Sequence, residues 1–177
     1  MTQDTILPDE LVEAARRVVA ANLKLGRRVS VAESCTGGLV AAAITEIPGS
    51  SAVLDRSFVT YSNDAKREVL KVSEDVLDTF GAVSVATAWR MAQGLLETTD
   101  ADVGVAITGI AGPGGGSAKK PVGTVVFARA ERDADPSNVV ADLKEFGDLG
   151  RGGIRLQAAL CALELLMPDA EVGESAA

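Results

Sequence analysis

The stretch from Arg28 to Gly38 reads RVSVAESCTGG and decides the fold. Its first part, Arg28 to Ala32, is short and rich in β-branched residues, which is typical of a strand. The next segment, Leu39 to Ile47, is alanine-rich and helical in pattern, and Pro48-Gly49 ends it. The run Ser34 to Gly38 is therefore predicted to be a tight turn between a strand and a helix.

Strands and helices alternate on both sides of this turn. A helix is predicted to open at Asp9 or Glu10 and to end at Gly26, with its apolar face formed by Leu11, Ala15, Val18, Val19 and Leu23. Further helices are predicted over 64–70, 73–80, 85–98 and 155–167, strands over 52–61, 101–108, 122–130 and 139–146, and a glycine-rich turn over 147–153. This order favours a three-layer α/β/α sandwich around a mixed, mostly parallel sheet.

The chain has 177 residues, which fits one domain, assigned to 1–168, followed by an acidic tail over 169–177 that we expect to be disordered. Apolar residues make up 47% and aromatic residues only 3%, so Ala, Val, Leu and Ile must build the core. The net charge of −8 argues against a nucleic-acid-binding surface, which needs a basic field.

The sequence contains no histidine, which excludes Ser-His-Asp and Cys-His catalysis and histidine-bound zinc. Cys35 and Cys161 lie far apart, so neither a disulfide framework nor a metal cluster is expected, and we expect no metal or other cofactor. The polar, acidic stretch Met1 to Glu10 does not resemble a signal peptide, and no apolar run is long enough to cross a membrane. We therefore expect a cytoplasmic protein.

Sites in open α/β sheets form beyond the carboxyl ends of the strands. Three connections of this kind are rich in hydroxyl groups, glycine or both, namely Ser34–Gly38, Tyr61–Lys66 and Thr108–Ser117. Their convergence is the strongest functional signal that the residues themselves carry.

A serine at a strand-to-helix turn can expose its hydroxyl, and the amides that follow can stabilise an oxyanion or a phosphate. Without histidine, a lysine is the remaining base for Ser34. Lys66 is the best placed, because it lies in the first turn of a helix, where the dipole disfavours a cation. Tyr61 could relay a proton or orient the amine. From position alone, a capping serine, a surface lysine and a half-buried tyrosine remain open alternatives.

The glycine run from Gly109 to Ser117 matches neither the dinucleotide-binding motif nor the P-loop, because a strand follows it and no Gly-Lys-Ser/Thr is present. It is either a phosphate-approaching loop with many free amides or a long mobile crossover. Cys35 is a rival nucleophile, since a helix N-terminus lowers a thiol pKa. It is disfavoured because no protonated histidine can assist it and because such cysteines usually pack inward.

Six blocks then occur in order: AESCTGG (32–38), GSSA (49–52), FVTYSNDAK (58–66), GAVS (81–84), GIAGPGGGS (109–117) and KPVGTV (120–125). Over nearly the whole chain they resemble the CinA C-terminal domain family. Its stand-alone members are similar to an enzyme that hydrolyses the carboxamide of nicotinamide mononucleotide to nicotinate mononucleotide and ammonia. The resemblance implies that Ser34 is the nucleophile, Lys66 its base and Tyr61 a catalytic neighbour, with turn amides holding the oxyanion.

The resemblance also implies a set of substrate-binding residues around the three connections: Glu33, Thr36, Gly37, Gly38, Thr108, Gly109, Gly112, Gly114, Gly115, Ser117 and Arg151. Family members commonly carry Gly-Asp-Arg after the last strand, with a second arginine four residues on. Here Arg151 and Arg155 keep that spacing, but Gly150 replaces the aspartate.

The residues and the resemblance together predict an amidohydrolase of pyridine-nucleotide salvage. Its expected partner is a small nucleotide substrate, and the resemblance to the family also implies a homodimer. No nucleic acid and no membrane are expected as partners. One alternative is a non-catalytic module that binds pyridine nucleotides. The other is an interaction protein associated with competence or DNA damage, as the family name suggests.

Overall fold

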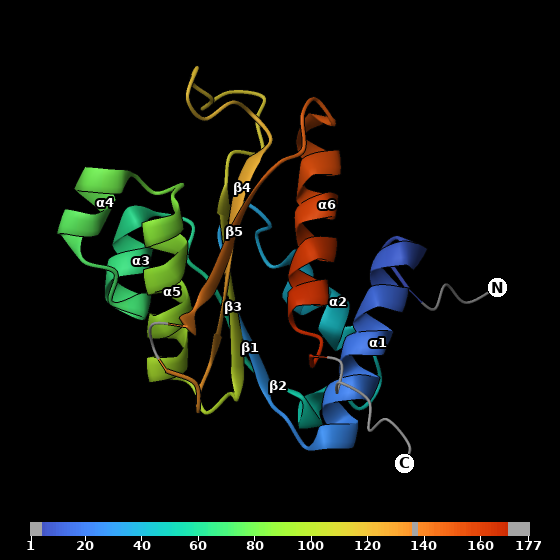
Figure 1. Ribbon diagram of the computed structural model, residues 1–177. Coiled ribbons are helices and arrows are strands. Elements are labelled where there is room, and N and C mark those ends of the chain that lie inside the picture. The colour runs from blue at the N-terminus through green and yellow to red at the C-terminus, as the bar shows by residue number, and fades with distance from the viewer. Residues whose placement is uncertain (1–4, 136–137, 170–177) are drawn as a thin grey trace, which may run out of the picture.

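A five-stranded sheet with helices on both faces forms the frame of the computed structural model, which describes residues 5–135 and 138–169 (Figure 1). The strands are β1 Val29–Glu33, β2 Leu54–Val59, β3 Val103–Gly109, β4 Thr124–Glu131 and β5 Val140–Glu145. The helices are α1 Asp9–Leu25, α2 Leu39–Thr45, α3 Asn63–Leu70, α4 Glu74–Phe80, α5 Val85–Thr98 and α6 Gly150–Leu165, with a short 3₁₀ helix, η1, at Ser50–Ala52.

The strand order is β2-β1-β3-β4-β5. β1 pairs in parallel with β2 and β3, β4 is antiparallel to β3, and β5 is antiparallel to β4. Glu33 at the end of β1 is in register with Val59 of β2 and Ile107 of β3. The sheet is therefore mixed, as predicted. The carboxyl-terminal ends of the parallel strands β1, β2 and β3 lie side by side at one end of the sheet.

Side chains that alternate along the strands separate two apolar layers. Val31, Val105 and Phe127 belong to the core shared with α1, α2 and α6, whereas Ala32 and Ala128 belong to the core shared with α5 and its neighbours. Figure 1 shows α3, α4 and α5 on one face of the sheet and α1, α2 and α6 on the other. The three-layer α/β/α sandwich is confirmed.

Helix ends follow the expected local chemistry. The serines before α3, α4 and α5, which are Ser62, Ser73 and Ser84, each accept a backbone N–H three residues on. Gly26 ends α1 in the left-handed conformation, with φ 64°. These four positions confirm the predicted helix boundaries.

Two predictions in the helices are wrong. Residues 147–153 are not a turn throughout, because α6 already begins at Gly150, so that Arg151 lies in its first turn. On α1, Leu23 is 52% exposed, and Asn22 occupies the buried position instead. The Asn22 NH₂ group donates to the carbonyls of Val18 and Leu166 in the core between α1 and α6, whereas its side-chain carbonyl oxygen is buried without a partner among the described residues.

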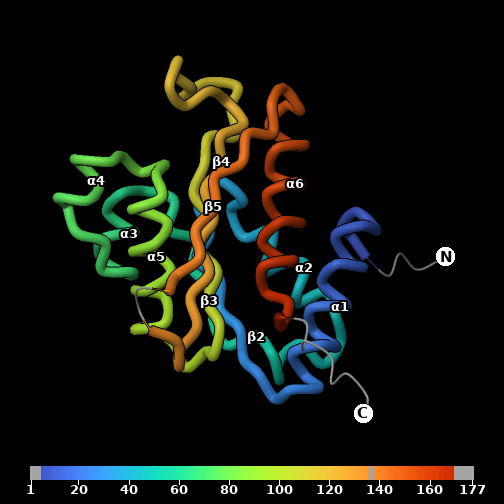
Figure 2. The backbone as a smooth tube through the Cα atoms, in the orientation of Figure 1, coloured from blue at the N-terminus to red at the C-terminus, as the bar shows by residue number. Residues whose placement is uncertain are grey.

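The predicted tail over 169–177 lies outside the described residues except for Asp169. The carboxylate of Asp169 accepts a hydrogen bond from Arg129 on β4 at 2.7 Å. Figure 2 shows that the loop between β3 and β4 extends beyond the sheet on the same side as the N-terminal end of α6. The glycine loop, Gly109 to Ser117, and Arg151 thus lie at the end of the sheet where β1, β2 and β3 end.

Candidate active site

Ser34 is the first residue after β1. Its N–H donates to the carbonyl of Ile107 on β3 at 3.0 Å, and its carbonyl accepts the N–H of Gly37 at 3.0 Å. Gly37 and Gly38 have φ values of 61° and 92°, which L side chains rarely adopt, so the two glycines allow the chain to reverse here. Ser34 is only 8% exposed. The predicted tight turn between strand and helix is confirmed.

Glu33 holds this turn against α2. Its fully buried carboxylate accepts three backbone N–H groups, from Gly38 at 3.0 Å, Val40 at 3.2 Å and Ala41 at 3.0 Å. A carboxylate at the start of a helix is favourable, because the unpaired N–H groups there carry partial positive charge. The substrate contact predicted for Glu33 finds no support in this geometry, since both of its oxygens are used within the fold.

Lys66 reaches Ser34 from α3, across the end of the sheet. Its Nζ atom lies 3.3 Å from the Ser34 hydroxyl oxygen, 2.9 Å from the Thr60 carbonyl and 3.4 Å from the Tyr61 carbonyl. The residue is only 1% exposed, which is unusual for a lysine. The structure therefore brings together the predicted nucleophile and the predicted base.

Three uncharged oxygen atoms surround the Lys66 amine, and their positions by themselves suit both its charged and its neutral form. A neutral amine has two N–H donors and one lone pair, whereas an ammonium has three donors and no acceptor. Here the two carbonyls can only accept, whereas the Ser34 hydroxyl accepts from either form of the amine and can donate only to the neutral one. None of the ion pairs among the described residues includes Lys66. Burial lowers the pKa of Lys66 below its ordinary value of 10.5, with a smaller opposing effect from Cys35.

Cys35 is less suited to attack than its neighbour Ser34. It is 5% exposed and belongs to the core beneath α2. Burial raises the pKa of the thiol from 9.0 to about 11, opposite to the lowering expected at a helix N-terminus. Because the thiolate is the reactive form, little of it exists near neutral pH.

Tyr61 takes part through its carbonyl, which accepts from Lys66, and separately through its phenol. The phenol oxygen accepts an N–H of Arg151 at 3.1 Å, and the side chain is 59% exposed. Arg151 also donates to the carbonyl of Gly112 at 2.7 Å. Arg151 thus connects the first turn of α6 with the glycine loop and with the segment that follows β2.

A cavity of about 400 Å³ lies beside Arg151. Its lining residues come from the glycine loop, the end of β5 and the start of α6: Ala111, Pro113, Pro121, Val122, Glu145, Gly147, Asp148, Gly150 and Arg151. Arg151 is the basic residue of this lining, and Glu145 and Asp148 are its two acidic residues. The phosphate contact expected of Arg151 therefore stays a prediction.

The remaining predicted residues divide between the turn and the tip of the glycine loop. The Thr108 hydroxyl donates to the Ala82 carbonyl at 2.7 Å, so it is engaged within the fold. Gly109 packs against the turn, since an added Cβ would lie 3.0 Å from the Cys35 sulfur. The exposed tip shows no hydrogen bond to Ser34 or Lys66 among the described contacts, and it contains Gly114, Gly115 and Ser117.

Arg155 is a site residue that sequence reasoning did not assign. Its guanidinium donates to the carbonyl of Thr36 at 2.8 Å and thereby ties α6 to the turn. The signal was its position one helical turn after Arg151, which places both side chains on one face. The hydroxyls of Thr36 and Thr60 are buried beside the site without a hydrogen-bond partner.

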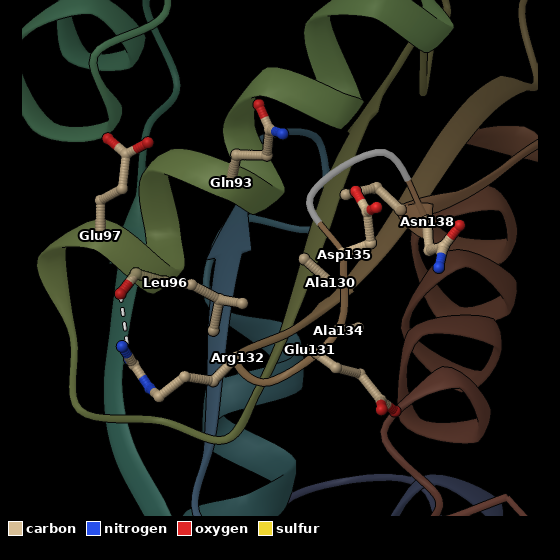
Figure 3. Close-up of a pocket in the computed structure, with 10 residues that line it drawn as sticks. Gln93, Leu96, Glu97, Ala130, Glu131, Arg132, Ala134, Asp135 and Asn138 are labelled. Carbon is tan, nitrogen blue, oxygen red and sulfur yellow. Dashed lines mark hydrogen bonds between the residues drawn. The ribbon is translucent and has the colours of Figure 1, made fainter.

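A second cavity, of about 230 Å³, lies at the opposite end of the sheet, where β4 ends (Figure 3). Arg132 at its wall donates to the carbonyls of Leu96 and Thr99, which satisfies the C-terminal end of α5. None of the predicted site residues lines this cavity.

Residues 5–135 and 138–169 contain neither a metal-binding cluster nor a membrane-spanning helix. No group of three or more His, Cys, Asp or Glu side chains is arranged there to hold a metal ion. No helix in those ranges has the length and apolar character that crossing a bilayer requires.

Comparison with known proteins gives a consistent picture. The family model of the CinA C-terminal domain matches residues 12–169. The nicotinamide-nucleotide amidohydrolase PncC of Enterobacter agglomerans is 52% identical over 160 residues, which cover 90% of this chain and 94% of that protein. A competence-damage inducible protein of Symbiobacterium thermophilum is 46% identical over 164 residues, but this chain spans only 37% of its length.

Solved structures agree with these sequence relatives. The competence/damage inducible protein CihA of Agrobacterium tumefaciens superposes with a TM-score of 0.87 at 54% identity, covering 92% of this chain and 96% of that one. A CinA superfamily protein of Klebsiella pneumoniae superposes with a TM-score of 0.81 at 36% identity. The chain therefore belongs to the CinA C-terminal domain family.

Proposed function

We propose that this chain is a serine-lysine amidohydrolase that converts nicotinamide mononucleotide and water to nicotinate mononucleotide and ammonia. The observation that carries the proposal is the buried contact between the Lys66 amine and the Ser34 hydroxyl, 3.3 Å apart. The name of the Enterobacter agglomerans relative supports the substrate, since that protein matches this chain over nearly its whole length.

In the first half-reaction, neutral Lys66 takes the hydroxyl proton of Ser34 while the serine oxygen bonds to the carboxamide carbon. Negative charge then develops on the carboxamide oxygen. The backbone N–H groups of Cys35 and Thr36 are the donors proposed for it, because the Glu33 carboxylate uses those of Gly38 and the first turn of α2 instead. Donors fixed before the reaction stabilise this charge without reorganisation.

The C–N bond then breaks, and the leaving nitrogen takes the proton that Lys66 holds, so ammonia departs and an ester remains on Ser34. A water molecule attacks this ester while Lys66, neutral again, accepts its proton. Collapse of that intermediate breaks the ester C–O bond and returns a proton to Ser34. The cycle is redox-neutral and consumes one water for each ammonia released.

Arg151 and Tyr61 are proposed to bind the nucleotide rather than to move protons. Support comes from their mutual hydrogen bond and from the position of Arg151 on the cavity between the glycine loop and α6. The predicted role of Tyr61 as a catalytic neighbour is kept here only for its carbonyl, which orients the Lys66 amine. The proposed location of the enzyme is the cytoplasm. Cys35 and Cys161 are both free thiols, which is compatible with that reducing compartment.

The test is ammonia release by the purified protein with nicotinamide mononucleotide, with the product identified by mass. Ser34→Ala should lower kcat by at least about a thousandfold, because no other group provides the attacking oxygen. Cys35→Ala is the matched control, one residue away, and should retain most of the activity. Full activity in the Ser34 variant, or its loss in the Cys35 variant, would overturn the nucleophile assignment.

Binding of the nucleotide without turnover by the natural chain would refute the amidase. It would support the non-catalytic binding module in its place, and titration calorimetry separates the two results. Neither binding nor turnover would remove nicotinamide mononucleotide as the ligand.

A further inference from the structure

The outer side of β5 is an open sheet edge. β5 is the last strand in the order and pairs only with β4. It is exposed along most of its length, with Val140 59% and Leu143 45% exposed, although both are apolar. In Figure 1, β5 lies along the edge of the sheet between the helical layer of α5 and that of α6. Open edges carry unpaired backbone groups that can pair with another strand.

The hydrogen bonds of β4 fix which β5 residues face outward. The Thr124 carbonyl accepts from Ile110 on the β3 side, so the backbone of the next residue, Val125, faces β5. Val125 is in register with Lys144, whose backbone therefore faces β4. By alternation, the N–H and C=O groups of Ala141, Leu143 and Glu145 point away from the sheet. No hydrogen bond within the described part of the chain uses these outward groups.

We propose that β5 pairs antiparallel with β5 of a second copy of this chain, about a two-fold axis at Leu143. The outward N–H of Leu143 then donates to the carbonyl of the partner's Leu143, and the reverse bond forms by symmetry. Ala141 is opposite the partner's Glu145 and forms the next hydrogen-bonded pair. The two sheets join into one sheet of ten strands.

Charge selects this register among those that the backbone allows. With the axis at Leu143, Asp142 is directly opposite the partner's Lys144, and Lys144 is opposite the partner's Asp142. These are pairs without mutual backbone hydrogen bonds, in which side chains approach most closely. An axis at Asp142 would oppose two aspartates, and an axis at Lys144 would oppose two lysines. The strand is therefore complementary to itself in one register only.

A groove beside β5 supports this side of the strand as the contact surface for the second copy. It has a volume of about 290 Å³ and lies between β4, β5 and α6, with an apolar wall formed by Phe127, Leu160, Cys161 and Leu165. Asp142 and Lys144 stand at its border. The proposed ion pairs would form over this groove and shield it from water.

Charged residues on an edge strand also serve to keep the edge unpaired. Charges that only prevent strand pairing need no particular order of positive and negative residues along the strand. Asp142 and Lys144 have opposite signs and equal spacing from Leu143, which is the arrangement that a two-fold axis requires.

The test is sedimentation velocity of the whole chain across a dilution series. Asp142→Lys and Lys144→Asp should each weaken dimerisation by about tenfold or more, because each replaces two opposite-charge pairs by two like-charge pairs. The double variant D142K/K144D restores opposite charges and should return to within about threefold of the natural chain. Asp78→Lys on α4 is the matched control, with the same change in net charge away from β5.

Leu143→Pro gives a second test, because it removes an outward N–H while sparing the bonds to β4, a position where an edge strand tolerates proline. It should be monomeric with an unchanged circular dichroism spectrum. A natural chain that is monomeric throughout the series would overturn the proposal. So would a dimer that the single charge variants leave intact, or a double variant no better than the single ones.

Discussion

Replacement of Lys66 by Met tests whether the base is held neutral by burial. Methionine keeps an unbranched, apolar side chain one atom shorter than that of lysine, so it removes the amine and exchanges one methylene for sulfur. In the folded protein, burial lowers the pKa of Lys66, whereas the unfolded chain keeps the ordinary value near 10.5. Between the two values, the unfolded chain binds one more proton than the folded chain. The unfolding free energy of the natural protein therefore rises with pH in that window.

One proton of difference corresponds to a slope of about 1.4 kcal/mol per pH unit. The variant lacks this titration, so its stability relative to the natural chain should fall by about 1.4 kcal/mol for each unit of pH. Above pH 10.5 the difference becomes constant and reflects the two carbonyls, of Thr60 and Tyr61, that have lost a donor. Buried acceptors without a partner cost about 1–3 kcal/mol each, so the variant should be the less stable protein there.

The assay is urea unfolding of both proteins at half-unit steps from neutral pH upward, at constant ionic strength. Lys24→Met on the exposed end of α1 is the control for the loss of one positive charge. A difference between Lys66→Met and the natural chain that stays constant across this range would refute the lowered pKa, and with it the neutral base. The amidase rate should rise with pH through the same titration, since only the neutral amine accepts a proton.

Two further predictions concern the frame of the site. Glu33→Gln should lower the unfolding free energy by about 1–3 kcal/mol, because an amide nitrogen cannot accept the N–H groups that one carboxylate oxygen now accepts; urea unfolding measures this, and an unchanged midpoint would contradict the capping role. Gly94→Ala should cost about 3 kcal/mol and lower activity, because its Cβ would lie 1.8 Å from the Leu70 carbonyl oxygen and push α5 from α3. Unaltered melting of the glycine variant would show that the two helices separate at little cost.

Much of the fold could be predicted because local signals and packing agree. The serine caps and Gly26 act within a few residues of the helix ends that they fix, so sequence alone is enough. The start of α6 could not be predicted in this way. Glycine disfavours helix, yet Gly152 and Gly153 are helical because the residues after them, from Ile154 on, are packed in the core between α6, α1 and the sheet.

The site shows the same division. Ser34 and Lys66 could be paired from sequence, because parallel strands bring their ends to one end of the sheet and the family resemblance implies the two roles. The role of Glu33 could not be inferred, since a carboxylate beside a serine looks available to substrate until its position under α2 is known. The sign of the Cys35 pKa shift was missed for a related reason, because burial in the core outweighs the nearby helix end.

The two carbonyls that hold the Lys66 amine belong to the backbone of Thr60 and Tyr61. In a serine-histidine enzyme the group that orients the base is itself a side chain, and one codon change deletes it. Here every residue type at those two positions still provides the carbonyl. A scan of all single substitutions for lost turnover should therefore find two inactivating positions of proton transfer, Ser34 and Lys66, and no third orienting residue. The path of the backbone therefore sets the orientation of the Lys66 amine, and a substitution can change that orientation only if it moves the backbone.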